Sequence, residues 1–244
     1  MTRAPHAPAP GPHPGFRLSI VVPTLEEAAS IEATLAAAQP ARLAGAEIVV
    51  ADGGSADATR ALAAPLADRV IEAARGRASQ MNAGALAASG DALLFLHADT
   101  LLPPDAHAAV LGALGAGREW GRFDVAISGS TPMLPVVAML MNARSRASGI
   151  ATGDQAIFAT RAAFEAAGRF PEIPLMEDVA LSKALGRRSR PACLRARVVT
   201  SGRRWERGGL LRTILLMWRL RLAYALGADP HGPARRYGIE RSSG

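Results

Sequence analysis

Near its start the chain reads Leu18-Ser19-Ile20-Val21-Val22-Pro23-Thr24-Leu25-Glu26-Glu27, an apolar run that ends abruptly in polar residues. A short run rich in Ile and Val is typical of a strand buried on both faces of a sheet. Similar runs follow at residues 47–51, 69–71 and 92–96, separated by alanine-rich, helix-prone stretches at 26–38, 56–67 and 78–88. This alternation predicts an α/β fold with a mostly parallel sheet, in which ligands bind beyond the carboxyl ends of the strands.

The second half of the chain is less regular. It predicts strands at residues 123–128, 156–159 and 194–200, and helices at 103–114, 135–148, 179–185 and 210–226. No linker or repeat separates the halves, so we expect one domain over residues 17–237. Residues 1–16, rich in Pro and Ala, and residues 238–244 are predicted to be tails.

Composition excludes several classes of protein. With 244 residues, 49% of them hydrophobic, the chain can bury a core and is not a disordered segment. Cys193 is the only cysteine, which excludes an intramolecular disulfide and a cysteine-based zinc site and favours a reducing cytoplasm. No run approaches the roughly 20 apolar residues of a spanning helix, and the start of the chain lacks the apolar core of a secretory signal.

Two glycine-rich phosphate motifs are absent. The first predicted strand runs into Thr24-Leu25-Glu26-Glu27, whereas a dinucleotide-binding fold would have G-x-G-x-x-G there, and no P-loop occurs anywhere. The second strand ends in Asp52-Gly53-Gly54-Ser55, where the carboxylate can accept a hydrogen bond from a base or a sugar. The alternative is an ordinary strand–turn–helix junction, with Ser55 or Asp57 capping the helix.

Acidic residues occur at two further sites of interest. Asp99 follows the fourth apolar run, where a carboxylate is a good oxygen ligand for Mg²⁺ or Mn²⁺. His97 is a weaker candidate, because imidazole prefers softer metals. Glu177 and Asp178 precede a predicted helix, either as simple complements of its dipole or as a general base with a neighbour that sets its pKa.

The order of these motifs resembles the family 2 glycosyltransferases, which have the GT-A fold. The resemblance covers residues 17–237 and rests on residues 19–27, Asp52-Gly53-Gly54-Ser55, His97-Ala98-Asp99, Glu177-Asp178 and Arg203-Arg204-Trp205. Within the family, the chain is similar to a small stand-alone bacterial subgroup that includes enzymes labelled arsenosugar-biosynthesis glycosyltransferases. That similarity rests on Gly121-Arg122-Phe123-Asp124, Gly153-Asp154-Gln155 and the run from Arg203 to Trp218.

The resemblance implies a role for each matching residue. Asp178 would be the general base, with Glu177 beside it, and Asp99 the metal-binding acid, with His97 where many relatives have another aspartate. Residues 17–100 would bind the nucleotide and residues 101–237 the acceptor. The residues implied in nucleotide-sugar binding are Pro23, Thr24, Glu26, Asp52, Gly53, Arg77, Asn82, Asp154, Arg204 and Trp205.

The implied activity is inverting transfer of one sugar from a nucleoside-diphosphate sugar, such as a UDP-sugar, with Mg²⁺ or Mn²⁺. The acceptor would be a hydroxyl or acid group of a lipid-like compound or a small, arsenosugar-type metabolite. Arg204 and Trp205 match the end of a Q-x-x-R-W motif that is typical of processive enzymes, but Ser201 replaces its glutamine, which favours single-sugar transfer. Two alternatives are a nucleotidyltransferase of related fold, which would need a Gly-rich loop after the first strand, and a basic nucleic-acid-binding protein.

The net charge of +7 is unevenly distributed. Residues 1–180 carry 13 basic and 18 acidic side chains, whereas residues 181–244 carry 15 and 3. This concentration argues against general nucleic-acid binding and predicts a local feature that faces a diphosphate, a membrane surface, or both. The helix at 210–226 is either a core-covering helix with snorkelling arginines or a peripheral contact with the inner membrane surface.

Overall fold

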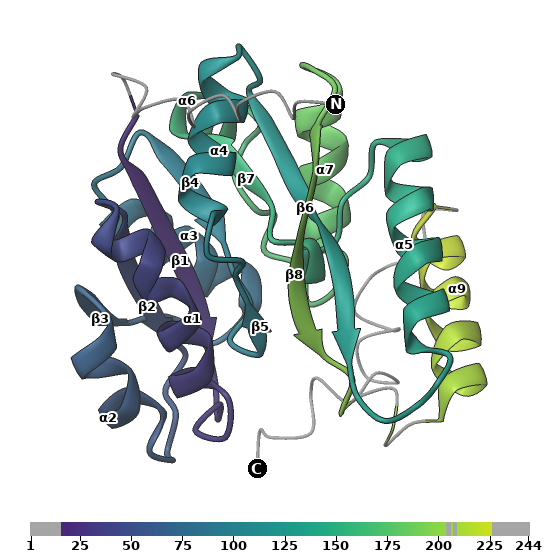
Figure 1. Ribbon diagram of the computed structural model, residues 1–244, viewed down its shortest axis with the longest axis horizontal. Coiled ribbons are helices and arrows are strands. Elements are labelled where there is room, and N and C mark those ends of the chain that lie inside the picture. Colours follow the sequence, from purple (N-terminus) through teal and green to yellow (C-terminus); the bar gives the residue numbers. More distant parts are fainter. Residues whose placement is uncertain (1–15, 204–205, 207–208, 226–244) are drawn as a thin grey trace, which may run out of the picture.

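One mixed sheet organises the chain in the computed structural model, which describes residues 16–203, 206 and 209–225 (Figure 1). The described strands follow the order β3-β2-β1-β4-β7-β6-β8-β5 across the sheet. Their bounds are β1 (Leu18–Thr24), β2 (Glu47–Asp52), β3 (Arg69–Glu72), β4 (Ala92–Phe95), β5 (Thr100–Leu101), β6 (Trp120–Ser128), β7 (Phe158–Thr160) and β8 (Ala192–Ser201). The α/β fold with helices around a central sheet, predicted from the alternation of apolar runs, is confirmed.

The first half of the sheet is parallel. β1 pairs with β2 on one side and with β4 on the other, and β3 continues the sheet beyond β2. Every residue of β1 is buried, as the uninterrupted apolar run predicts. The register sets Thr24 beside Asp52, so β1 and β2 end at the same level and present their following turns to one edge.

The second half turns the sheet into a mixed one. β7 is antiparallel to both β4 and β6, β6 is parallel to β8, and the short β5 is antiparallel to β8. The predicted strands at 123–128, 156–159 and 194–200 correspond to β6, β7 and β8. β5 was not predicted, because two residues are too few to show a periodicity.

Helices cover both faces of the sheet (Figure 1). One core cluster joins β1 to α1, α2 and α4, and Phe16, the last residue of the predicted tail, packs against it. A second cluster on the opposite face joins the sheet to α3, α6 and α7. The bounds of the described helices are α1 (Ile31–Leu43), α2 (Thr59–Ala63), α3 (Arg77–Ala87), α4 (Ala106–Gly115), α5 (Leu134–Ser148), α6 (Arg161–Ala166), α7 (Glu177–Gly186) and α9 (Leu210–Ala225), with 3₁₀ turns η1 (Ala64–Leu66) and η2 (Gly153–Gln155).

The first helix begins five residues later than predicted. Glu26 has a left-handed φ of 56°, which interrupts a helix. The backbone N–H groups of Glu26 and Glu27 donate to the hydroxyls of Ser55 (2.9 Å) and Thr59 (2.8 Å) instead of entering a helix. The segment after β1 is therefore a turn held by side chains from the segment after β2.

The final helix, α9, agrees with the prediction for residues 210–226. Its Leu220 is buried in a small cluster with Leu175, Met176 and Val179, at and before the start of α7. One face of the helix therefore covers a core, as the first of the two alternatives predicts, while Leu215 and Trp218 are exposed. None of the described helices is long and apolar enough to cross a membrane. The boundary at residue 237 and the tail at 238–244 lie outside the described residues, as does the first tail up to residue 15.

Candidate active site

A cavity of about 660 Å³ opens at the carboxyl ends of the parallel strands, where the fold predicts a ligand. Pro23 and Thr24 line it from the end of β1, and His97 and Asp99 line it from the segment after β4. Segments distant in sequence complete the wall: residues 75–80 at the start of α3, Thr152 and Asp154 of the η2 turn, and residues 172–179 at the start of α7. The topology thus brings together most of the residues implied in binding and catalysis.

Asp178 lies in this cavity at the first turn of α7. Its Oδ2 accepts a hydrogen bond from the backbone N–H of Gly153 (2.8 Å), and its Oδ1 accepts one from the N–H of Val179 (2.7 Å). Burial and the negative charge of Glu177 raise the pKa of Asp178 to about 6. A carboxylate with such a pKa is ionised at neutral pH and is basic enough to accept a proton during a reaction.

Glu177, its neighbour, is almost completely buried and forms an ion pair. Its Oε1 lies 3.0 Å from the guanidinium of Arg77, at the first turn of α3. Burial of Arg77 opposes its charge, but the carboxylates of Glu177 and Asp178 outweigh that effect and raise the pKa of Arg77 above its ordinary value. Arg77 lines the cavity, but the ion pair with Glu177 neutralises at least part of its charge.

The η2 turn explains the motif Gly153-Asp154-Gln155. Gly153 donates its N–H to Asp178, and Asp154 places Oδ1 3.4 Å from Nδ1 of His97. Gln155 is fully buried and closes a capping box with Thr152, which fixes the turn. Each residue of the motif therefore has a separate structural task.

His97 is held between this turn and the end of β4. Its Nε2 is buried and has no hydrogen-bond partner among the described residues. A Cβ built on Gly153 would overlap Nε2 and Cε1 of the ring, so the imidazole lies directly against the glycine. The side chain is thus directed at the η2 turn.

Asp99 suits a hard divalent cation bound together with a phosphate. Its side chain is 31% exposed and lines the cavity. No group of three or more His, Cys, Asp or Glu residues that could hold a metal occurs in the described part of the chain. Mg²⁺ is commonly bound by one or two carboxylates, several waters and substrate phosphates, so a single accessible carboxylate fits this mode of binding.

Asp52 ends β2 and is completely buried. Its carboxylate accepts hydrogen bonds from the hydroxyls of Thr24 (2.9 Å) and Ser55 (2.6 Å) and from the backbone N–H groups of Gly54 and Ser55. Burial disfavours the charge, but these hydrogen bonds outweigh it and hold the pKa of Asp52 below its ordinary value. Asp52 and Gly53 lie behind Thr24 and do not line the cavity.

Two other expected binding residues also lie outside the cavity lining. Glu26 accepts a hydrogen bond from the backbone N–H of Ala56 (2.7 Å), which ties the turns after β1 and β2 together. Asn82 exchanges two hydrogen bonds with the backbone of Phe170, at 2.8 and 3.1 Å. Both side chains shape the loops around the cavity rather than facing it.

Of the lining residues that received no role from the sequence, three stand out. Gln80 is buried and donates its side-chain amide to the carbonyls of Thr24 and Ala51, which joins α3 to the ends of β1 and β2. Glu27 faces the cavity where Glu26 was expected to do so. Arg221 of α9 lines it as well, and its buried Nε has no hydrogen-bond partner among the described residues.

The last helix forms one wall of the cavity. Thr213, Met217 and Arg221 are spaced by four residues, so they share one face of α9, and all three line the cavity. Leu215 and Trp218 are 63% and 73% exposed. Arg204 and Trp205, which the resemblance assigns to nucleotide-sugar binding, lie outside the described residues.

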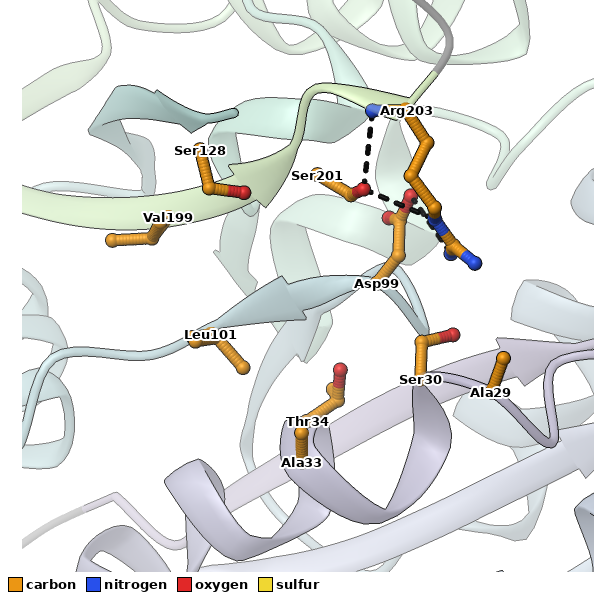
Figure 2. Close-up of a pocket in the computed structure, with 10 residues that line it drawn as sticks. All are labelled: Ala29, Ser30, Ala33, Thr34, Asp99, Leu101, Ser128, Val199, Ser201 and Arg203. Atoms are coloured by element: carbon orange, nitrogen blue, oxygen red, sulfur yellow. Dashed lines mark hydrogen bonds and ion pairs between the residues drawn. The ribbon is translucent and has the colours of Figure 1, made fainter. Parts of the chain in front are cut away.

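A smaller pocket of about 220 Å³ adjoins the cavity through Asp99 and Ser201, which line both (Figure 2). Ser30 just before α1, Thr34 of α1, Leu101 of β5 and Arg203 contribute to its wall. Figure 2 shows the Arg203 side chain extending past Ser201 toward Asp99.

The motif Gly121-Arg122-Phe123-Asp124 lies in β6, away from the cavity lining. Arg122 is fully buried and pairs with Asp124, which also binds Arg146 of α5 at 2.5 Å. Gly121 leaves no room for a side chain against Phe158 and the backbone of Ala192. This motif therefore fastens α5 to the sheet.

Comparison with solved structures identifies similar folds. The mannosyltransferase PcManGT from Pyrobaculum calidifontis, solved with GDP-Man and Mn²⁺, has a TM-score of 0.64 at 24% identity, with 96% of this chain and 68% of that one covered. TarS 1-349 of S. aureus, solved with UDP-GlcNAc, has a TM-score of 0.60 at 16% identity over 76% of this chain and 58% of that one. Glucosyl-3-phosphoglycerate synthase from Mycobacterium tuberculosis, solved with Mn²⁺, UDP and glucosyl-3-phosphoglycerate, has a TM-score of 0.56 at 22% identity over 76% of this chain and 71% of that one.

Sequence comparison gives the family directly. A search of curated proteins finds no match. The model of the family described as glycosyl transferase family 2 matches residues 19–163, from β1 into α6, and so includes most of the strands and the segment that carries Asp99. With more than half of the chain matched, the protein belongs to glycosyl transferase family 2.

Proposed function

We propose that the protein transfers a single sugar from a nucleoside-diphosphate sugar, with inversion at the anomeric carbon. The observation that carries this proposal is the placement of Asp178 and Asp99 in one cavity, from the start of α7 and the end of β4. A base and a metal-binding acid are the two acidic functions that such a transfer needs. Structures of similar fold contain GDP-Man or UDP-GlcNAc, which supports a nucleotide-sugar donor.

In this mechanism Asp178 takes the proton from the acceptor hydroxyl. As the acceptor oxygen bonds to the anomeric carbon, the bond from that carbon to the diphosphate oxygen breaks on the opposite face, and the diphosphate leaves with the electron pair. The N–H groups of Gly153 and Val179 hold the Asp178 carboxylate in place. Attack from the face opposite the leaving group inverts the configuration and needs no covalent enzyme intermediate.

The diphosphate would lie on the side of Asp99. We assign Asp99 to a divalent cation, Mg²⁺ or Mn²⁺, which when bound offsets the negative charge that develops on the leaving group. The cations of Arg75 and Arg221 line the same cavity and add to this positive field. His97 and Asp154 position the turn beside the sugar, and we do not assign a metal to the ring nitrogen that is directed at Gly153.

The nucleoside would lie over Pro23 and Thr24. Asp52, Gly53, Glu26 and Asn82 act in this proposal through the loops that they hold, because their side chains are outside the cavity lining. Arg204 and Trp205 keep the nucleotide-sugar-binding role that the family resemblance implies. The subgroup resemblance makes a small arsenosugar-type metabolite or a lipid-like compound the first acceptors to test.

The deciding experiment is a donor screen that measures release of nucleoside diphosphate, with an acceptor library of lipids and small hydroxylated metabolites. We expect turnover with a nucleotide sugar and Mg²⁺ or Mn²⁺, and none with nucleoside triphosphates alone. Asp178→Asn should lower turnover by about 10²–10⁴-fold with little change in nucleotide affinity. Asp99→Ala should weaken diphosphate binding and raise the metal concentration needed. Near-wild-type turnover of the Asp178 variant would contradict the assignment.

The exposed side chains of α9 support a further part of the proposal, a peripheral contact with the cytoplasmic face of the cell membrane. Leu215 and Trp218 are exposed on α9, and Arg212 and Arg219 are exposed on the same helix. A surface with Trp, Leu and Arg side chains is suited to the boundary between anionic headgroups and acyl chains. This contact would place a lipid-like acceptor near the cavity wall that α9 forms.

A further inference from the structure

The guanidinium of Arg203 lies close enough to Asp99 to compete with a metal ion for its carboxylate. Its terminal nitrogen is 4.0 Å from Oδ2 of Asp99 and 3.7 Å from Oε2 of Glu27. The two carboxylates come from the segment after β4 and the turn after β1, so one guanidinium pairs with both segments. Figure 2 shows it beside Asp99 in the smaller pocket that adjoins the cavity. Opposite charges at such distances attract one another even at a partly exposed site.

The conformation of Arg203 is fixed by a neighbour. The hydroxyl of Ser201 accepts hydrogen bonds from both the backbone N–H (3.3 Å) and the side-chain Nε (3.1 Å) of Arg203. Ser201 itself lies at the end of β8, and its backbone N–H donates to the carbonyl of Asp99 at 3.1 Å. These hydrogen bonds link the end of β8, Ser201 and Arg203, and the linked residues direct the guanidinium of Arg203 at Asp99.

Glu27 is fixed as well. Its Oε2 accepts a hydrogen bond from the hydroxyl of Ser30 at 2.7 Å, just before the start of α1. The side chains of Glu27, Asp99 and Arg203 are 32%, 31% and 43% exposed, so solvent and a substrate can reach all three. An arginine fork is also well suited to a diphosphate, which offers it an alternative anion.

We propose that Arg203 is an internal counter-cation that occupies Asp99 in the absence of substrate and makes tight metal binding depend on the nucleotide diphosphate. This inference rests on the proposed function, because it takes Asp99 as the metal-binding acid. When a diphosphate arrives, the guanidinium exchanges the two carboxylates for phosphate oxygens, and Asp99 becomes available to the cation. Because coupling between two ligands is reciprocal, the metal in turn strengthens binding of the diphosphate.

The experiment measures binding rather than turnover. Mn²⁺ affinity is determined by electron paramagnetic resonance of the free ion, and UDP and GDP affinities by calorimetry, each with and without the other ligand. In Arg203→Met we expect Mn²⁺ alone to bind about three- to tenfold more tightly, and the nucleoside diphosphate without metal to bind at least threefold more weakly. Opposite signs for the two ligands are the signature of a counter-cation.

Two control variants separate this role from a general effect of charge. Arg203→Lys keeps a cation but loses the fork and the Nε–H that bonds to Ser201, so both affinities should lie between those of the wild type and of Arg203→Met. Arg188→Met removes an arginine of similar exposure, 39%, which pairs with Glu119 and does not line the cavity, and it should change neither affinity. A thermal denaturation curve for each variant confirms that the fold is kept.

The outcomes distinguish the inference from the proposed function. If Arg203→Met leaves Mn²⁺ affinity unchanged or weakens it, the counter-cation role is wrong, whether or not the protein transfers a sugar. If the wild type binds Mn²⁺ and nucleotide with the expected coupling but transfers no sugar from any donor, the proposed function fails while the role of Arg203 stands.

Discussion

The guanidinium of Arg77 lies 3.0 Å from the carboxylate of Glu177, and these residues are one hundred positions apart in the chain. Arg77 begins α3, between β3 and β4, and Glu177 begins α7, beside the proposed base. The second carboxylate oxygen of Glu177 is buried without a hydrogen-bond partner among the described residues. This ion pair thus joins the two halves of the cavity and compensates a charge that is almost fully buried.

Removal of Arg77 should therefore destabilise the protein. In Arg77→Met the buried Glu177 charge loses its partner, and we expect a loss of about 1–3 kcal/mol in the free energy of unfolding, because Arg77 itself is partly exposed. The measurement is urea denaturation at pH 7. Adding Glu177→Gln should restore part of the loss. If the double variant is less stable than Arg77→Met, the pair is not the cause.

The pH dependence of turnover should report Asp178. Its pKa of about 6 means that the basic form is lost as the pH falls, so kcat should decline below pH 6 and level off above pH 7. Arg77→Met should shift this decline to higher pH, because Arg77 lowers the pKa of Asp178. A pH–rate profile for each enzyme provides the measurement. An unchanged midpoint in the variant would show that the titrating group is not Asp178.

The raised pKa of Asp178 also predicts how the stability of the protein depends on pH. The folded pKa of this residue lies above the ordinary value of 3.8, so the folded state favours the protonated form. The stability that Asp178 contributes is therefore complete below pH 4 and is lost as the pH rises through 6. Between pH 4 and pH 8 the wild type should lose on the order of 1–3 kcal/mol relative to Asp178→Asn. Denaturation curves of both proteins at the two pH values test this.

Gly153 should tolerate no side chain. In Gly153→Ala the new methyl group overlaps the His97 ring, so either the ring or the η2 turn must move, and the N–H that holds Asp178 moves with the turn. We expect a loss of about 1–3 kcal/mol in stability and a lower kcat. Gly112→Ala is the matched control: it lies in α4 with open space around it and should be neutral or stabilising by up to about 1 kcal/mol. Equal stability of the two variants would contradict the steric argument.

Membrane contact can be tested on α9. Leu215→Ser combined with Trp218→Ser should reduce co-sedimentation with vesicles that contain anionic lipid, and neutral vesicles should bind the wild type weakly. Leu43 of α1 is 89% exposed, so Leu43→Ser serves as the control for loss of one exposed apolar side chain elsewhere. Donor hydrolysis in solution should be retained by all three proteins. Equal sedimentation of the double variant and the wild type would argue against the contact.

Much of the fold could be predicted because most of its strands coincide with short apolar runs that are visible in the sequence. The residues of β1 are all buried, and the sequence shows this as an unbroken apolar run. β5 gave no signal, since it has two residues and pairs only with β8, about one hundred positions later. The start of α1 was misplaced because Ser55 and Thr59, rather than helical carbonyls, accept hydrogen bonds from the residues after β1.

The candidate site also has residues that could be predicted from the sequence and contacts that could not. Asp99 and Asp178 could be found because each follows or begins a predictable element. The contacts of Asp178 with Gly153, and of Gln80 with Thr24, join residues that only the folded chain brings together. The sequence also could not show that the carboxylate of Asp52 accepts hydrogen bonds from its own turn. An acidic residue at the end of a strand can either bind a ligand or stabilise the turn that follows, and the residue type is the same in both cases.

The wall that α9 supplies has a consequence for how this enzyme can diversify. The sheet is complete at Ser201, and Asp99 and Asp178 reach the cavity without any contribution from the last helix. Thr213, Met217 and Arg221 lie on an element that follows the last described strand and packs mainly on the start of α7. Under the proposed function, substitutions of Thr213 and Met217 can therefore alter which acceptors are admitted while Asp99, Asp178 and the folding core stay as they are, so acceptor selectivity and catalysis can evolve separately.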